Sequence, residues 1–256
     1  MIEKVRTGLW FLRRPSFWPH ALALVKRKIS LASRHERHRP AAEKWADSRS
    51  VSDSQALAAL GMVESGHVLP KLGEEDIEEA RHRAEKSDVE MGGPGGLELL
   101  YAATVLSGAQ RVVETGVAYG WSSFVVLSAL EKQGSGRLAS VDMPYPKLGN
   151  EPFVGIVVPE VLRSRWRLIR EPDRNGLRKA LAAFGGEIDL CHYDSDKSYD
   201  GRMFAYPILW DALRPGGVFI SDDIQDNFAF RDFFTTNHVE FQIVGSRGKF
   251  IGLAKK

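Results

Sequence analysis

Cysteine is nearly absent from the 256 residues, since Cys191 is the only one. A single thiol cannot form an internal disulfide or a cysteine-rich zinc site, so both kinds of stabilising crosslink are excluded. Cys191 lies in the apolar stretch 188–193, where we expect a small buried core residue rather than a nucleophile.

Long apolar runs are also missing. No stretch reaches the roughly 18 consecutive apolar residues of a membrane-spanning helix. The first residues lack the apolar core and small-residue cleavage site of a secretory signal. With 43% hydrophobic residues the chain can still build a sizeable core. We therefore expect a globular, cytoplasmic protein whose membrane contact, if it has any, is peripheral.

Acidic residues are scarce in one segment only. Residues 1–50 hold twelve Lys or Arg against four acids, a balance of +8. Because the whole chain carries +2, the remaining residues carry −6. The first fifth of the chain is thus a different kind of segment from the rest, and we call residues 1–50 the N-terminal arm.

The N-terminal arm contains the pattern of a basic amphipathic helix. Apolar side chains recur at helical spacing opposite the basic run 26–28, at Leu22, Val25, Ile29 and Ala32. Such a helix suits an anionic membrane surface. It also suits packing on its own domain or on a second subunit of a homo-oligomer. Charge alone gives only weak support to nucleic acid, which we do not expect as a partner.

The rest of the chain divides into two parts. Helices expected at 53–60 and 74–86 make residues 51–90 a helical segment or lid, which the glycine-rich turn 92–96 ends. From residue 91 onward strands alternate with helices. The expected strands are 111–114, 137–141, 166–170, 188–193, 218–221, 240–244 and 250–253. The expected helices are 97–106, 121–132, 176–184, 202–213 and 228–236.

This alternation predicts the fold class. Strands separated by helices form a parallel sheet that is covered on both faces. The last two strands are joined by a short glycine-containing turn, which predicts an antiparallel hairpin. We therefore expect a doubly wound α/β domain over 91–256, with a mostly parallel sheet, a C-terminal hairpin and an N-terminal helical extension.

A ligand-binding loop is indicated by VVETGVAYGWSS, residues 112–123. Glu114, Gly116 and Gly120 lie where an expected strand turns into a helix, so the backbone can approach a ligand closely. The spacing differs from the Gly-x-Gly-x-x-Gly of dinucleotide folds, which disfavours nicotinamide and flavin cofactors. Asp142 ends the next strand and is placed to accept both hydroxyls of a ribose. Taken alone, it could also be a solvated acid.

With this loop and strand order, residues 91–256 resemble the class I S-adenosylmethionine-dependent methyltransferases. The resemblance implies a seven-stranded sheet, with the cofactor lying across the ends of the first two strands. It implies that the ribose contacts Asp142 and that Ser122 holds the cofactor's carboxylate. The full set of implied cofactor contacts is Glu114, Gly116, Ala118, Gly120, Ser122, Asp142 and Asp194.

Two further segments, YDSDKSYD (193–200) and GGVFISDDIQDN (216–227), narrow the resemblance. They are similar to the cation-dependent O-methyltransferases of the catechol and caffeoyl-coenzyme A type and to uncharacterised bacterial members. The resemblance implies that Asp194, Asp222 and Asp223 bind a divalent cation such as Mg²⁺. It also implies that Lys197, beside Asp194, is the catalytic base toward the substrate hydroxyl. Asp223 departs from the usual Asn and adds negative charge next to the substrate.

Elementary chemistry supports this site independently. In a doubly wound sheet the loops after the first and fourth strands face each other, so 193–199 would lie opposite 114–120. Three carboxylates offer oxygen ligands to an octahedral Mg²⁺, and a bound metal lowers the pKa of a hydroxyl.

A structural interpretation of the same residues stays open. Asp222 and Asp223 could cap the next helix while Lys197 pairs with Asp194 or Asp196. His192, one residue before the loop, is expected to be a hydrogen-bonded strand residue rather than a ligand.

We therefore expect an S-adenosylmethionine-dependent O-methyltransferase that acts on a hydroxyl of a small molecule or saccharide with the help of a divalent cation. One alternative is a methyltransferase that needs no metal. Another is a non-catalytic module, attached to a membrane or a partner, that keeps the cofactor pocket. The acceptor cannot be read from fold and loop, although the insertion 144–165 could shape the acceptor or adenine side.

Overall fold

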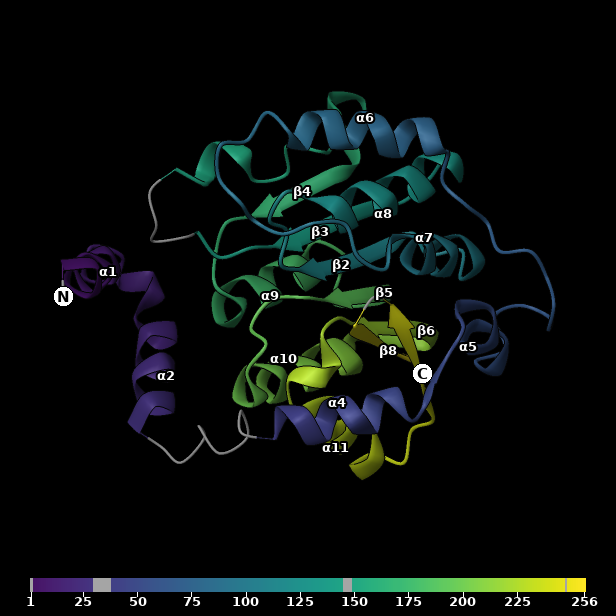
Figure 1. Ribbon diagram of the computed structural model, residues 1–256. Helices are drawn as coiled ribbons and strands as arrows, with labels where there is room; N and C mark the ends of the chain where they lie inside the picture. Colours follow the sequence, from purple (N-terminus) through teal and green to yellow (C-terminus); the bar gives the residue numbers. More distant parts are fainter. Residues whose placement is uncertain (1, 30–37, 145–148, 247) are drawn as a thin grey trace.

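A mostly parallel sheet runs through the molecule and positions the other elements (Figure 1). The computed structural model describes residues 2–29, 38–144, 149–246 and 248–256. Within them the strand order is β1-β7-β8-β6-β5-β2-β3-β4, and only β8 runs antiparallel to its neighbours β6 and β7. The strands are β1 (Ser50–Val51), β2 (Arg111–Thr115), β3 (Arg137–Val141), β4 (Trp166–Ile169), β5 (Ile188–Tyr193), β6 (Leu213–Ser221), β7 (Phe241–Ser246) and β8 (Lys249–Lys255).

The doubly wound sheet with its antiparallel C-terminal hairpin is confirmed, with one correction. The sheet of the described residues has eight strands rather than seven. The additional strand β1 pairs with β7 through Ser50↔Ile243 and Val51↔Val244. Two residues are too few to show the alternation of apolar and polar side chains by which a strand is recognised in a sequence.

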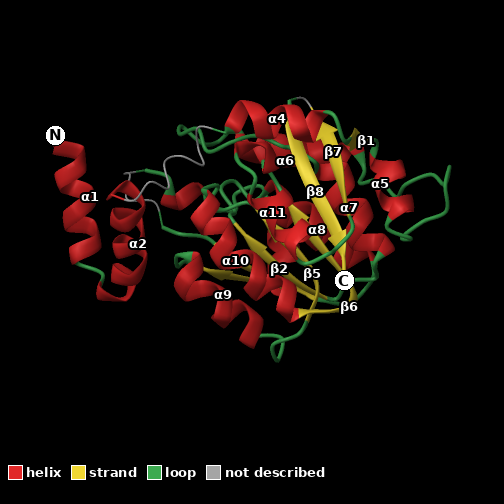
Figure 2. Cartoon of the chain, turned by 90° about the horizontal axis from the view of Figure 1, so that it is seen from below, coloured by secondary structure: helices red, strands yellow, loops and turns green. Residues whose placement is uncertain are grey.

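Helices cover both faces of the sheet (Figures 1 and 2). One face packs against α5 (Asp53–Ala59), α6 (Glu74–Ala84), α7 (Leu97–Leu106) and α8 (Trp121–Lys132). The other packs against α4 (Arg39–Asp47), α9 (Asp173–Ala182), α10 (Tyr199–Ala212) and α11 (Ala229–Thr236). The remaining described helices are α1 (Ile2–Leu12), α2 (Trp18–Ile29), and the short 3₁₀ turns η1 (Pro15–Phe17), η2 (Glu151–Phe153), η3 (Glu160–Arg165) and η4 (Ile224–Asp226).

Successive side chains of a strand point to opposite faces of the sheet, so each strand contributes to the hydrophobic core on both faces. In β2, Val112 belongs to the cluster under α7 and α8, whereas Val113 belongs to the cluster under α9 and α10. In β5, Leu190 and Cys191 divide in the same way. Cys191 is fully buried, and burial raises the pKa of its thiol, as expected for a core residue.

The helices of the N-terminal arm differ in how they contact the rest of the molecule. Its last helix, α4, packs on the domain, with Ala42 and Ala46 fully buried. By contrast, α1 and α2 stand together at one side of the sheet (Figure 2). The amphipathic helix expected around Leu22 and Val25 corresponds to α2, while Ala32 lies outside the described residues. None of the described helices is long and apolar enough to cross a bilayer.

Candidate active site

Four parallel strands end level with one another, which gathers their following residues at one edge of the sheet. Thr115 of β2 pairs with Val141 of β3 and with Tyr193 of β5, and Tyr193 pairs with Ser221 of β6. The first residue after each of these strands is therefore found at the same edge: Gly116, Asp142, Asp194 and Asp222. All four are residues for which the sequence predicts a functional role.

The loop after β2 needs its glycines. Gly116 has a φ of +81°, and a Cβ there would overlap the backbone carbonyl of Asp194. Gly120 has a φ of +88° and directly precedes α8, and a Cβ there would lie 3.0 Å from the Cα of Gly155. Between them, Ala118 also has a positive φ of 49°. The loop is thus held close to the 193–199 loop, as the sheet topology predicts.

Glu114 lies deeper than the loop that follows it. Its carboxylate is fully buried and accepts hydrogen bonds from Ser123 Oγ at 2.5 Å and Ser140 Oγ at 2.6 Å. Ser123 lies in the first turn of α8, next to Ser122, for which the sequence predicts a contact with the cofactor's carboxylate. Ser122 is half-buried and lies in the first turn of α8.

His192 connects Glu114 to the carboxylates at the strand ends. Its Nδ1 is 3.6 Å from Glu114 and its Nε2 is 3.3 Å from Asp222. Burial opposes a charge on the imidazole, but Asp222 and Glu114 outweigh it and raise the pKa of His192 to about 10. The two carboxylates thus favour the charged form of the imidazole in this arrangement.

Asp142 and Gly116 line a cavity of about 230 Å³, which we call the cofactor cavity. The Asp142 carboxylate accepts a hydrogen bond from the Val117 amide at 3.1 Å and forms an ion pair with Arg170. Burial raises the pKa of Asp142, although Arg170 lowers it. The hydroxyls of a ribose bound here would donate to the same carboxylate oxygens that contact the Val117 amide and Arg170. Neither donor was apparent in the sequence.

The cofactor cavity also contains residues that the sequence did not indicate. Asp173 begins α9 and accepts a hydrogen bond from Ser195 Oγ at 2.5 Å. Burial raises the pKa of Asp173 to about 7. His20 and Leu24 of α2 close another side of the cavity, so the N-terminal arm reaches the candidate site. Contacts between segments this far apart in the sequence have no local signature.

Lys197 is the centre of a charged cluster. Its Nζ is 3.1 Å from Asp194 Oδ1 and forms a closer ion pair with Asp223. Burial opposes the charge of Lys197, but Asp194 and Asp223 outweigh it and raise the pKa of Lys197 above its usual value. Burial and the nearby Asp222 raise the pKa of Asp194 to about 6. We call Asp194, Lys197, Asp222 and Asp223 the carboxylate cluster.

The carboxylate cluster, as arranged, does not fit a divalent cation. Lys197 occupies the space between Asp194 and Asp223, and the ring of His192 faces Asp222. No group of three or more His, Cys, Asp or Glu side chains among the described residues is disposed to hold a metal ion. The charges of the three predicted ligands are instead compensated by side chains of the protein.

A fully buried arginine supports the turn that carries Asp222 and Asp223. Arg202 Nη2 donates to the backbone carbonyl of Asp222 at 3.1 Å and to that of Asp223 at 2.8 Å. Asp223 has a φ of +51°, a left-handed conformation that these contacts help to hold. This role cannot be predicted from the sequence, because an arginine on a helix is usually exposed.

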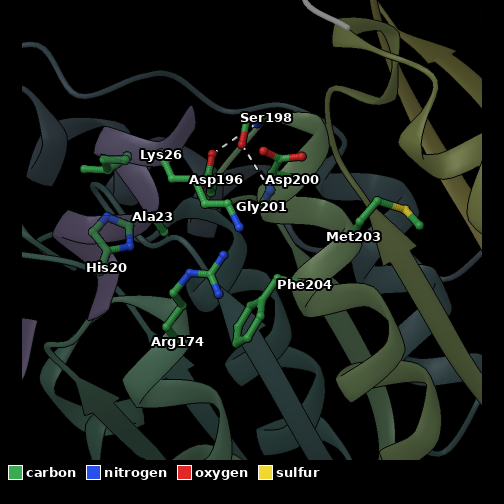
Figure 3. Close-up of a pocket in the computed structure, with 11 residues that line it drawn as sticks. His20, Ala23, Lys26, Arg174, Asp196, Ser198, Asp200, Gly201, Met203 and Phe204 are labelled. Atoms are coloured by element: carbon green, nitrogen blue, oxygen red, sulfur yellow. Dashed lines mark hydrogen bonds between the residues drawn. The ribbon is translucent and has the colours of Figure 1, made fainter. Parts of the chain in front are cut away.

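Two larger cavities adjoin the site. One, of about 430 Å³, is lined by Asp222, Asp223, Lys249 and the glycine-rich turn before α7, and we call it the second cavity. The other, of about 450 Å³, lies between α2, α9 and α10. In Figure 3 the Arg174 guanidinium and the Phe204 ring lie side by side in this hollow. The Arg174 Cζ atom is 4.2 Å from the centroid of the ring.

Comparison with known proteins agrees with this arrangement. Residues 113–224 match the family model described as a methyltransferase domain. No curated protein matches the chain in sequence.

Solved structures share the fold at low sequence identity. An O-methyltransferase from Bacillus cereus in complex with S-adenosylhomocysteine is 17% identical over 80% of this chain and 100% of that chain, with a TM-score of 0.51. The cofactor-bound protein Rv0187 from MTB is 15% identical over 81% of this chain and 98% of that chain, with a TM-score of 0.56. The O-methyltransferase TomG from Streptomyces achromogenes, in complex with S-adenosylmethionine, is 18% identical over 80% of this chain and 98% of that chain, with a TM-score of 0.52.

At this level of identity the structures show the fold alone, and the family match covers residues 113–224, less than half of the chain. The chain thus has the fold of these solved structures, and within it residues 113–224 match a methyltransferase domain.

Proposed function

We propose that the protein is an O-methyltransferase that transfers a methyl group from S-adenosylmethionine to a hydroxyl of a small molecule or saccharide. The observation that carries this proposal is the position of the carboxylate cluster. Asp194 lines the cofactor cavity, Asp222 and Asp223 line the second cavity, and Lys197 joins the two sides through Asp194 and Asp223. A donor in the cofactor cavity and an acceptor in the second cavity would therefore meet at these four side chains.

The residues around the cofactor cavity suit the donor. Gly116 lets the backbone come close to a ligand, and Asp142 offers carboxylate oxygens to a ribose. When bound, S-adenosylmethionine supplies a methyl group on a sulfonium, and its transfer is an in-line displacement by an oxygen nucleophile. The protein must then align the acceptor oxygen and remove its proton.

The carboxylate cluster can perform both tasks. Burial and Asp222 raise the pKa of Asp194 to about 6, close to neutral pH, which suits a carboxylate that receives the hydroxyl proton. Lys197 keeps its own proton in this arrangement, so its ammonium can donate a hydrogen bond to the acceptor oxygen and stabilise the charge that develops there. For Lys197 to act as the base that the sequence predicts, it would first have to lose that proton.

The divalent cation is the less supported part of the original prediction. Lys197 and His192 already neutralise part of the negative charge of the carboxylate cluster. This compensation favours the alternative of a methyltransferase that needs no added metal, and no step of the proposed reaction passes through one.

A panel of paired acceptors tests the proposed function. Each hydroxylated small molecule or saccharide is supplied with labelled S-adenosylmethionine, next to an analogue in which the hydroxyl is replaced by hydrogen. We expect label to enter only the hydroxylated member of a pair. If the protein binds S-adenosylhomocysteine but labels no hydroxyl in a broad panel, it is better described as a binding module that keeps the cofactor pocket.

A further inference from the structure

Helices α1 and α2 expose a group of large apolar side chains. Five of the seven exposed large hydrophobic residues among those described lie within these two helices and are between 47% and 68% exposed: Leu9, Leu12, Trp18, Leu22 and Val25. The other two, Val68 and Val161, lie elsewhere on the chain. We call the group of five the apolar face of the arm. Its concentration in 17 residues distinguishes it from scattered surface hydrophobics.

The two sides of α2 have different surroundings. Trp18, Leu22 and Val25 follow the spacing i, i+4, i+7, so they share one side of the helix. His20 and Leu24 point to the opposite side, where they line the cofactor cavity and the adjoining hollow shown in Figure 3. The apolar face is therefore not the side on which α2 packs against its own domain.

Specific contacts fix the inner side of the arm. Phe17, between the two helices, is buried, and the carbonyl of Ser16 accepts a hydrogen bond from Asn175 Nδ2 at 2.8 Å. The Trp18 indole N–H donates to the carbonyl of Phe11 at 3.2 Å, which ties α2 to the end of α1. These contacts hold α1 and α2 against each other and against the domain, while the five apolar side chains stay exposed.

The charge around the apolar face has one sign. Residues 4–35 contain eight Lys or Arg and no acid. Among them Arg13, next to Leu12, and Lys26, next to Val25, are exposed, and Lys26 also borders the hollow shown in Figure 3. Apolar side chains flanked by cations complement a surface that is apolar inside and anionic outside.

We propose that the apolar face of the arm binds the surface of an anionic lipid bilayer. Its leucine, valine and tryptophan side chains would enter the boundary between headgroups and acyl chains, while Arg13 and Lys26 would contact anionic headgroups. A second copy of the chain fits the observations less well. In a symmetric dimer this face would meet itself, so the cations around it would lie against cations of the second copy.

Vesicle sedimentation of the full chain tests the proposal. We expect the protein to sediment with vesicles of phosphatidylcholine plus phosphatidylserine, and not with vesicles of phosphatidylcholine alone. Added salt should weaken the binding, because it screens the attraction between Arg13, Lys26 and the headgroups. The double variant Leu22→Gln/Val25→Gln should lower the vesicle-bound fraction by about tenfold, because both side chains lose their apolar contact with the bilayer.

The chain offers a matched control for this variant. Val68→Gln/Val161→Gln removes two apolar side chains outside the arm that are even more exposed, and it should leave vesicle binding unchanged. S-adenosylhomocysteine affinity and circular dichroism confirm that both double variants are folded.

Three outcomes would overturn the proposal. The first is equal binding of the two double variants to anionic vesicles. The second is a wild-type protein that ignores anionic vesicles or binds neutral ones equally well. The third is a wild-type dimer that Leu22→Gln/Val25→Gln dissociates while vesicle binding is absent, since the apolar face would then belong to a second copy. None of these measurements depends on methyl transfer, so they can fail separately from the proposed function.

Discussion

Strand β5 has a charged cluster at each end, and the two clusters differ in how completely their polar atoms are satisfied. At its beginning, Asp189 accepts hydrogen bonds from the backbone amides of Gln110 and Arg111 at 3.0 and 2.8 Å. The guanidinium groups of Arg111 and Arg214 add contacts at 2.8 and 2.7 Å. Every oxygen of this carboxylate therefore has a partner, and the cluster ties β2, β5 and β6 together.

At the other end of β5 the pairing is incomplete. Glu114 Oε1 and His192 Nδ1 are buried, and neither has a hydrogen-bond partner in the described part of the chain. Lys197 is shared between two carboxylates. Polar groups left in this state are costly in a scaffold and common where a ligand completes the network. The comparison separates a structural end of the sheet from a functional one.

The largest effect is expected from Lys197→Met. The variant keeps the length of the side chain and removes its charge, so turnover should fall by about 10²–10⁴-fold. Affinity for S-adenosylhomocysteine, measured by calorimetry, should stay within about twofold of wild type because Lys197 does not line the cofactor cavity. Lys179→Met, which breaks an exposed pair with Glu171, is the control and should leave turnover unchanged. An equal loss of cofactor affinity in Lys197→Met would indicate a structural role.

Asp189→Asn should have the opposite profile, with a loss of stability and normal turnover. Breaking a buried ion pair costs about 3–5 kcal/mol. Because the Arg111 and Arg214 side chains are about a third exposed, we expect a smaller loss of about 2–3 kcal/mol in the free energy of unfolding, measured with urea. Normal stability in this variant would remove the distinction between the two ends of β5.

The same residue gives the stability a defined dependence on pH. Burial opposes the charge of Asp189, but Arg111, the Gln110 amide and Arg214 outweigh it and lower the pKa of Asp189. A lowered pKa contributes stability above the unfolded value of about 3.9, and this contribution disappears as the pH falls through the folded value. Wild type and Asp189→Asn should therefore differ in unfolding free energy at pH 7 and converge in acid.

Asp142→Ala should weaken the binding of S-adenosylhomocysteine by about 10–100-fold, because a ribose would lose one or two hydrogen bonds to a carboxylate. The variant also leaves Arg170 without one of its partners, so thermal unfolding must be measured beside calorimetry. Arg170→Gln separates the two effects, since it removes the ion pair and keeps the carboxylate. Unchanged affinity in Asp142→Ala would place the ribose elsewhere in the cofactor cavity.

The order of strands and helices could be predicted from sequence because each strand of the domain is a short apolar run between turn residues. Element boundaries were less certain. The sequence predicts a strand from residue 218, whereas β6 begins at Leu213, since Pro215, Gly216 and Gly217 hide its first half. Similarly, α10 begins at Tyr199 after the cap Ser198 rather than at residue 202.

The residues of the candidate site could be predicted only where their spacing in the sequence and the strand order place them. Asp194 and Lys197 are three residues apart, and the topology alone places them opposite Gly116. The buried Arg202 and the coverage of the cofactor cavity by His20 depend on contacts between distant segments. No pattern along the chain reports such contacts, because they are selected by the packing of the finished fold.

The smallest effect is expected from removing divalent cations. Because Lys197 already compensates Asp194 and Asp223, turnover in EDTA should stay within about twofold of turnover in Mg²⁺. Titration with Mn²⁺, followed by electron paramagnetic resonance, should show weak binding to wild type and tighter binding to Lys197→Met, whose carboxylates lack the ammonium. A collapse of turnover in EDTA that Mg²⁺ reverses would contradict this expectation. It would mean that a cation displaces Lys197 and completes the pairing at the functional end of β5, as Arg111 and Arg214 complete it at the structural end.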